Sequence, residues 1–180
     1  LTAPTIYSLA LTSDPTPLYR IEVDPRPTAD PVIQLFDLED PFPLAVTRMH
    51  PYVPSVAAIC TCEPAGPNAK WRPFSETGGK LVIEPVPGLP AIERGVSWKL
   101  TTYGAKSVVC TMAGGLFGYE NESLRLARYG LSGPGGFKAE TVFEILRGGG
   151  FECELGIVIQ TFTHIEAERR KALKKGKKSR

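Results

Sequence analysis

The sequence predicts a mainly β fold, an antiparallel closed β-barrel of about 10–12 strands enclosing a C-terminal hydrophobic helix. Three observations predict it. Short runs with strand character recur from residue 6 to residue 146, and helical patterns do not alternate with them. The 17 prolines and 18 glycines are spread along the chain as turn punctuation. One apolar stretch near the C-terminus carries helix signals and needs a place to be buried.

The length indicates a single domain. A chain of 180 residues is of ordinary single-domain size and can bury most of the surface that its unfolded form exposes. We expect one barrel domain over residues 1–171, with the central helix at about 152–171, and a basic tail at 172–180.

The first strands are predicted between proline turns. In the segment 18–24, Tyr19, Ile21 and Val23 alternate with more polar residues, which is typical of a sheet with one wet face. Four Asp-Pro pairs connect these early segments, and an Asp before Pro favours extended or turn geometry. The early strands are expected at residues 6–12, 18–24, 32–38 and 44–49.

The later strands follow a loop at residues 63–70, which holds two prolines and a glycine. A hairpin is expected where residues 103–106 form the turn between two strands. The Gly-rich stretch 113–118 lacks the Lys-Ser/Thr pair of a phosphate loop, so its glycines are interpreted as turn residues. The later strands are expected at residues 56–62, 80–86, 96–102 and 107–112, in the segment ESLRLARYG (122–130) and at 139–146.

The terminal helix is predicted at about 152–171. Glu152 and Glu154 lie in its first turn and basic residues close it, which is the charge order that a helix dipole favours. Its apolar positions cover most of the circumference, so the helix is expected to be buried. The apolar part spans about a dozen residues, short of the roughly 20 that cross a bilayer. Because Ile157, Val158 and Ile159 are β-branched, a strand is the alternative.

The strongest charge feature is the C-terminal end. The last twelve residues hold eight of the 21 basic residues and no acid, while the other 168 carry 13 basic against 19 acidic residues, a net charge of −6. Such an end can bind anionic membrane or nucleic acid, or it can be a solvated terminus. The predicted contact residues are Arg169, Arg170, Lys171, Lys174, Lys175, Lys177 and Lys178.

Catalytic and metal sites are not indicated. The two histidines, His50 and His164, lie in no recognisable catalytic motif. Cys60 and Cys62 would share one face of a strand, but no third ligand lies close in sequence. We therefore expect no catalytic residue, no metal and no cofactor. Four cysteines are few for a secreted scaffold, which favours a reduced, intracellular protein, and we expect a monomer.

The order of the segments resembles the tubby C-terminal-like superfamily. The resemblance rests on the run of short strands, the VSWKL strand (96–100) with a hairpin after it, the ESLRLARY segment, and the apolar terminal helix running into ERRK (168–171). It covers roughly residues 18–171. The superfamily includes tubby proteins, phospholipid scramblases and LURP-one-related proteins, and the chain is most similar to an uncharacterised fungal family within it.

The resemblance implies a twelve-stranded barrel around a central hydrophobic helix. Tubby proteins bind phosphoinositides through basic residues on barrel strands, and this chain has no clean counterpart of that basic pair. Scramblases hold a calcium-responsive acidic segment beside their terminal helix, which this chain lacks, so their activity is not carried over.

The function expected from the sequence is that of a non-enzymatic, intracellular binding module. Its partner would be an anionic phospholipid or phosphoinositide surface, and the protein would then be cytoplasmic and peripheral to a membrane. The alternative is a protein or nucleic-acid interaction module that uses the barrel face and the basic tail. A cryptic hydrolase is a third, weaker interpretation.

Overall fold

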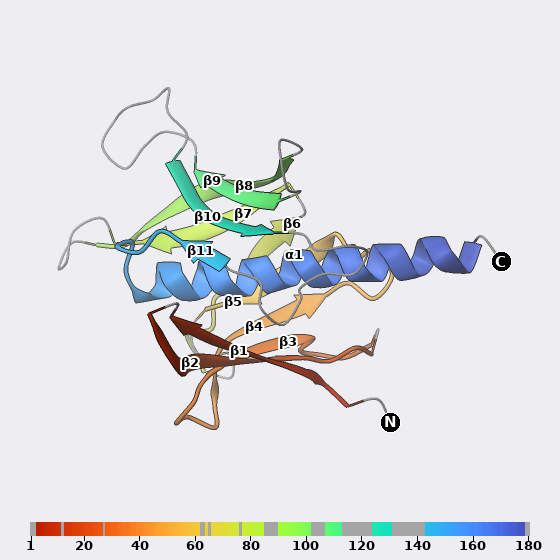
Figure 1. Cartoon of the computed structure of the whole chain (residues 1–180), viewed down its shortest axis with the longest axis horizontal. Coiled ribbons are helices and arrows are strands. Elements are labelled where there is room, and N and C mark those ends of the chain that lie inside the picture. The colour runs from red at the N-terminus through yellow and green to blue at the C-terminus, as the bar shows by residue number, and fades with distance from the viewer. Residues whose placement is uncertain are drawn as a thin grey trace.

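A computed structural model describes residues 3–178 apart from positions 12, 27, 62, 63, 65, 76, 85–89, 102–106, 113–123 and 131–142. For residues 100, 101 and 175–178 it describes the backbone alone. Figure 1 shows the strands arranged around one long helix. The elements are β1 (Thr5–Leu11), β2 (Asp14–Val23), β3 (Ile33–Asp37), β4 (Pro43–Met49), β5 (Val56–Cys60), β6 (Arg72–Ser75), β7 (Gly78–Ile83), β8 (Ile92–Thr101), β9 (Ser107–Met112), β10 (Leu124–Gly130), β11 (Phe143–Ile145) and α1 (Phe151–Lys178).

The strands form one antiparallel sheet in which each strand pairs with its neighbours in chain order, from β1 to β11. The register carries apolar side chains across the sheet on one face. Ile21, for example, lies opposite Tyr7 on β1 and Leu35 on β3, and both Ile21 and Leu35 are fully buried. The mainly β prediction, with a strand count inside the expected range, is therefore confirmed.

The prediction that the sheet closes into a barrel is wrong. In the described part of the chain, no pairing joins β1 to β11. Eleven antiparallel strands make β1 and β11 parallel to each other, so a direct pairing would break the alternation. β11 is also only three residues long and offers little edge to pair with. The sheet curls around α1 and stays open between β1 and β11. We call this opening the seam.

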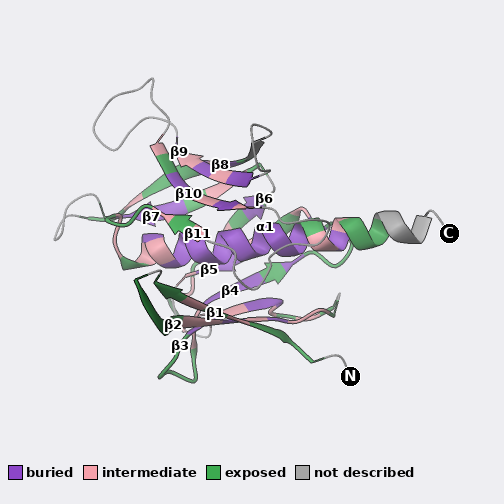
Figure 2. Cartoon of the chain, viewed as in Figure 1, coloured by how far each residue is buried: buried purple, intermediate pink, exposed green. Residues whose placement is uncertain are grey.

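The helix lies inside the curl of the sheet, as predicted, and not at its edge as a strand. Every residue from Leu155 to Ala167 is buried, and the buried band runs along the inner part of α1 in Figure 2. The helix begins at Phe151 and ends at Lys178, one residue before and seven residues beyond the predicted bounds. The segment predicted as a tail is therefore helical as far as Lys178.

The start of α1 is set by glycine. Gly148 and Gly150 both have positive φ, at 111° and 87°, a backbone region that other residues rarely adopt. The first helical hydrogen bond runs from the N–H of Glu154 to the carbonyl of Gly150. Further along the helix, Gly156 lets α1 approach β7 closely, since a Cβ there would lie 2.7 Å from a methyl carbon of Leu81.

Buried polar side chains fix the rotation of α1 within the sheet. Gln160 donates to the carbonyl of Lys80 on β7 at 2.8 Å and accepts from the indole N–H of Trp98 on β8 at 3.2 Å. At β4, the hydroxyls of Thr163 and Thr47 lie 2.8 Å apart. Because a buried polar group without a partner costs free energy, these bonds favour one orientation of the helix over its neighbours.

One strand was missed by the sequence prediction. β6 has four residues, and its Pro73, which cannot donate a backbone hydrogen bond, lies opposite Ala58 of β5. A proline inside a short run argues against a strand, which explains the omission. The expected turns at 103–106 and 113–118 lie outside the described residues, although the strands on either side of the first, β8 and β9, pair as predicted.

Candidate functional site

The first two cations of the predicted basic site, Arg169 and Arg170, belong to an ion-pair cluster in α1. Arg169 makes two hydrogen bonds to the carboxylate of Glu166, at 2.6 and 2.7 Å, and these bonds raise the pKa of the Arg169 guanidinium. Arg170 is buried and bonds to the same carboxylate at 2.7 Å and to the carbonyl of Arg26 at 3.3 Å. Glu166 is itself buried, so these two arginines neutralise a carboxylate inside the fold.

The next two cations of the predicted site lie nearer the surface. Lys171 pairs with Glu168 at 2.6 Å, one turn back on the helix. Lys174 is exposed and donates a hydrogen bond of 2.7 Å to the backbone carbonyl of Tyr52, in the loop between β4 and β5. This bond ties the loop to the outer part of the helix.

The outer end of α1, residues 172–178, extends beyond the strands (Figures 1 and 2). Its described side chains, at positions 172 to 174, are exposed. For Lys175, Lys177 and Lys178 the structure gives the helical backbone only. The seven predicted cations are thus not equivalent. Arg169 and Arg170 pair with a buried carboxylate, whereas the lysines from 174 onward lie on the part of α1 that extends beyond the strands.

Sequence reasoning missed three exposed apolar side chains on the β4–β5 loop and the outer end of α1, two segments that the bond between Lys174 and Tyr52 joins. Tyr52 is 80% exposed, and Val53 in the same loop and Leu173 on α1 are exposed as well. The ring nitrogen Nδ1 of His50 accepts hydrogen bonds from the N–H groups of Tyr52 and Val53, which shapes the loop that presents them. The signal available in the sequence was the segment HPYVPS (50–55), an aromatic residue between two prolines.

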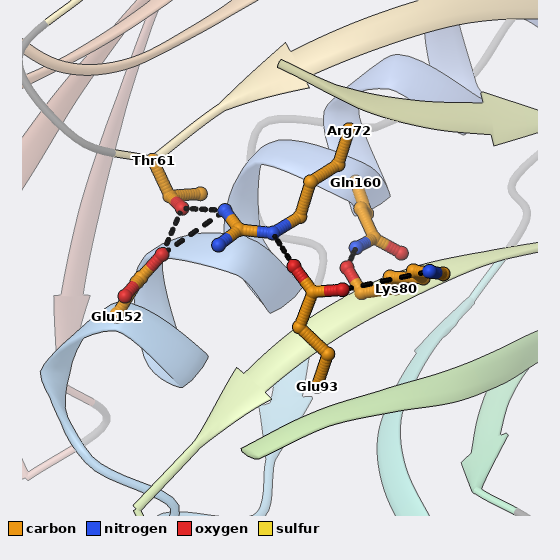
Figure 3. A network of polar contacts seen from close by, with 6 residues as sticks. All are labelled: Thr61, Arg72, Lys80, Glu93, Glu152 and Gln160. Carbon is orange, nitrogen blue, oxygen red and sulfur yellow. Dashed lines mark hydrogen bonds and ion pairs between the residues drawn. The ribbon is translucent and has the colours of Figure 1, made fainter. Parts of the chain in front are cut away.

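The structure shows a second polar cluster, centred on Arg72 of β6 (Figure 3). Its guanidinium lies 2.8 Å from Glu93 of β8 and 3.0 Å from Glu152 in the first turn of α1, and it donates to the hydroxyl of Thr61 at 3.1 Å. Burial opposes the charge of Arg72, but the two carboxylates outweigh burial and raise the pKa of the guanidinium. The hydrogen bond from Arg72 lowers the pKa of Glu93. Lys80 lies 3.5 Å from the other oxygen of Glu93.

The cluster around Arg72 joins β6, β8 and α1, and it leaves little room for a ligand. The adjoining cavity has a volume of about 10 Å³, enough for roughly one water molecule. Every charge in the cluster has a partner of opposite sign. We therefore interpret the cluster as a structural tie between the sheet and the first turns of the helix.

The histidines and described cysteines have structural surroundings. The ring nitrogen Nδ1 of His164 lies 2.9 Å from the buried hydroxyl of Tyr129, inside the sheet, whereas His50 is exposed in the loop described above. Cys60, Cys110 and Cys153 are buried and form no disulfide bond with one another, and Cys62 lies outside the described residues. Burial raises the pKa of Cys110 to about 12 and that of Cys153 to about 11.

Neither a metal site nor a membrane-spanning helix is present among the described residues. They contain no cluster of three or more His, Cys, Asp or Glu side chains that could hold a metal ion. Within the same residues, no helix has the length and apolar character needed to cross a membrane.

Comparisons with known proteins add no assignment. No protein-family model, no curated protein and no solved structure matches this chain. The resemblance to the tubby C-terminal-like superfamily therefore stays a prediction.

Proposed function

We propose that this chain is a non-enzymatic binding module that attaches to anionic phospholipid surfaces, including phosphoinositides, through the outer end of α1. The observation that carries the proposal is the projection of this cationic helical segment from a helix whose inner part is held in the core. Under this proposal, the protein works inside the cell at the periphery of a membrane.

The charge of the projecting segment supports the proposal. Lys174, Lys175, Lys177, Lys178 and Arg180 lie in the last seven residues without an intervening acid. Each basic residue near an anionic membrane contributes about 1 kcal/mol, so the segment would supply several kcal/mol of attraction. Because α1 continues into the core, the four lysines lie on a helix whose direction is already fixed.

The exposed apolar side chains beside the segment favour a membrane over a freely dissolved anion as the binding partner. Tyr52 is an aromatic residue of the type enriched at the membrane–water interface, and Val53 and Leu173 add apolar surface. An amphipathic surface with cations and apolar side chains side by side is typical of proteins that lie on a bilayer.

The proposal is tested by vesicle sedimentation at low and at high salt. Vesicles of phosphatidylcholine alone are compared with vesicles that also contain phosphatidylserine or phosphatidylinositol bisphosphate. We expect binding to the anionic vesicles only, and weaker binding as salt screens the charges. Binding of the double variant Lys174→Glu, Lys177→Glu should be at least about tenfold weaker, since each reversal replaces an attraction with a repulsion.

The matched control is the double variant Arg94→Glu, Lys99→Glu, which makes the same change of net charge at exposed positions of β8. It should bind like the unaltered chain. Truncation is better placed after Lys171 than near Glu168, because loss of Arg169 and Arg170 would leave the buried Glu166 without its partners. The proposal is overturned if anionic vesicles fail to retain the protein, or retain all variants equally. Binding to an RNA oligonucleotide with indifference to lipid would favour the alternative interaction module.

A further inference from the structure

The open seam of the sheet contains a groove of about 550 Å³, within the size range of ligand sites in proteins. One wall is formed by β1 with the adjacent part of β2, and the other by β11. The floor is α1, which contributes the buried Val158 and the half-buried Glu154. In Figure 1 the helix is visible between β1 on one side and β11 on the other.

Both walls of this groove are strand edges. β1 pairs with β2 and β11 pairs with β10, and in the described part of the chain neither has a second strand partner. Each edge therefore presents main-chain N–H and C=O groups to the groove. Sheet edges of this kind are sites at which another extended segment can add as a strand.

The direction of the strands specifies how such a segment would run. With eleven strands in antiparallel order, β1 and β11 run the same way. A single segment running the opposite way would be antiparallel to both at once, and it would continue the pattern of the sheet without a break. One added strand is thus the smallest number that keeps the whole sheet antiparallel.

The side chains that line the groove suit alternating residues. Leu9 on β1 and Phe143 and Ile145 on β11 are half-buried and pack against the core from the inner face. An added strand would direct every second side chain onto these residues and onto Val158. At one end, Arg147 pairs with Glu154 at 2.9 Å and Tyr19 donates to Glu154 at 3.2 Å, so this end is polar.

We propose that the seam between β1 and β11 binds an extended peptide segment of a partner protein, antiparallel to both strands, with apolar residues at alternate positions. A peptide fits better than an acyl chain of a lipid, because a hydrocarbon would cover two rows of main-chain polar groups without offering them hydrogen bonds. The site is separate from the basic end of α1 and does not depend on lipid binding.

The experiment selects a phage-displayed library of random seven-residue peptides against the immobilised full chain and measures the affinity of the synthetic peptides obtained. We expect apolar residues at alternate positions, and slower amide hydrogen exchange in residues 5–11 and 143–145 when the peptide is bound. The double variant Leu11→Lys, Leu18→Lys, at two exposed residues of the groove, should lower the affinity at least about tenfold.

The control is Leu38→Lys. Leu38 has nearly the same exposure as Leu11, 44% against 42%, but does not line the groove, so this substitution should leave the affinity unchanged. The proposal is overturned if no peptide is selected, if the selected peptides bind the double variant equally well, or if they protect other parts of the chain from exchange. It is also overturned if laurate, a free fatty acid, binds in the groove while every peptide fails. Failure of the vesicle experiment leaves this proposal unaffected.

Discussion

The inner and outer parts of α1 have the same backbone geometry and very different surroundings. Residues 155–167 are enclosed by the sheet, and their polar side chains bond to β4, β7, β8 and β10. Residues 172–178 extend beyond the strands and are rich in lysine. The comparison indicates a difference along one helix: the inner part contributes to the stability of the whole fold, and the outer part has the exposure that the proposed membrane contact requires.

The largest expected effect comes from a matched pair of leucines on α1. Leu155 is 2% exposed and Leu173 is 55% exposed. Leu155→Ala should lower the free energy of unfolding by about 2–5 kcal/mol, because it removes buried surface and leaves a cavity. Leu173→Ala should change it by less than about 0.5 kcal/mol. Urea unfolding followed by circular dichroism measures both, and similar values for the two variants would remove the distinction between the parts of the helix.

A second effect is the titration at alkaline pH of two buried thiols, Cys110 on β9 and Cys153 in the first turn of α1. Burial raises the pKa of the Cys110 and Cys153 thiols from 9.0 to about 12 and about 11. Above pH 9 the folded chain keeps thiol protons that the unfolded chain loses. The contribution of the two protonated thiols to the free energy of unfolding is therefore complete below pH 9, and it is lost as the pH rises through their folded-state pKa values. Stability should fall by up to about 1.4 kcal/mol per pH unit for each thiol above pH 9.

Urea unfolding at several values between about pH 8 and pH 9.5 checks this expectation. Tyr7, Tyr19 and Tyr129 also have raised pKa values in the folded chain, so their titration from 10.0 upward adds a slope of the same sign at higher pH. The double variant Cys110→Ala, Cys153→Ala should be less stable at neutral pH but should show a flatter dependence. A slope as steep as that of the unaltered chain would show that these thiols are not the cause.

A smaller effect compares two buried threonines of the inner part. The hydroxyl of Thr163 bonds to the carbonyl of Ile159 and lies 2.8 Å from the hydroxyl of Thr47 on β4. Thr163→Val removes a partner of Thr47 and should cost about 1–2 kcal/mol. The hydroxyl of Thr161 bonds to the carbonyl of Ile157 in the same helix, so Thr161→Val should cost less. Equal costs would mean that the bond to β4 does not hold the helix in place.

Much of the fold could be predicted because it depends on local patterns. The alternation of Tyr19, Ile21 and Val23 identified β2, and the all-round apolar surface of residues 155–165 identified a buried helix. The open seam could not be predicted in this way. Closure depends on the parity and length of strands far apart in the chain, and the missed β6 changes that parity by one.

The sequence predicted the charge of the candidate site but not the contacts of its side chains. The sequence placed Arg169 to Lys178 together as cations, but it could not show that Arg169 and Arg170 neutralise a buried Glu166. It also gave no reason to connect Tyr52 with Lys174, since the loop between β4 and β5 and the end of α1 meet only in the folded chain. Contacts between distant segments are set by packing, which residue periodicity does not report.

The most direct measurement is amide hydrogen exchange along α1 in the unaltered chain, read residue by residue by NMR. We expect the amides of residues 155–167 to exchange only through global unfolding, with an opening free energy equal to that from urea. The amides of residues 172–178 should exchange far faster by local fraying. Exchange of the inner amides at rates close to those of the outer end, under conditions in which the sheet stays protected, would contradict the enclosure of the helix by the sheet.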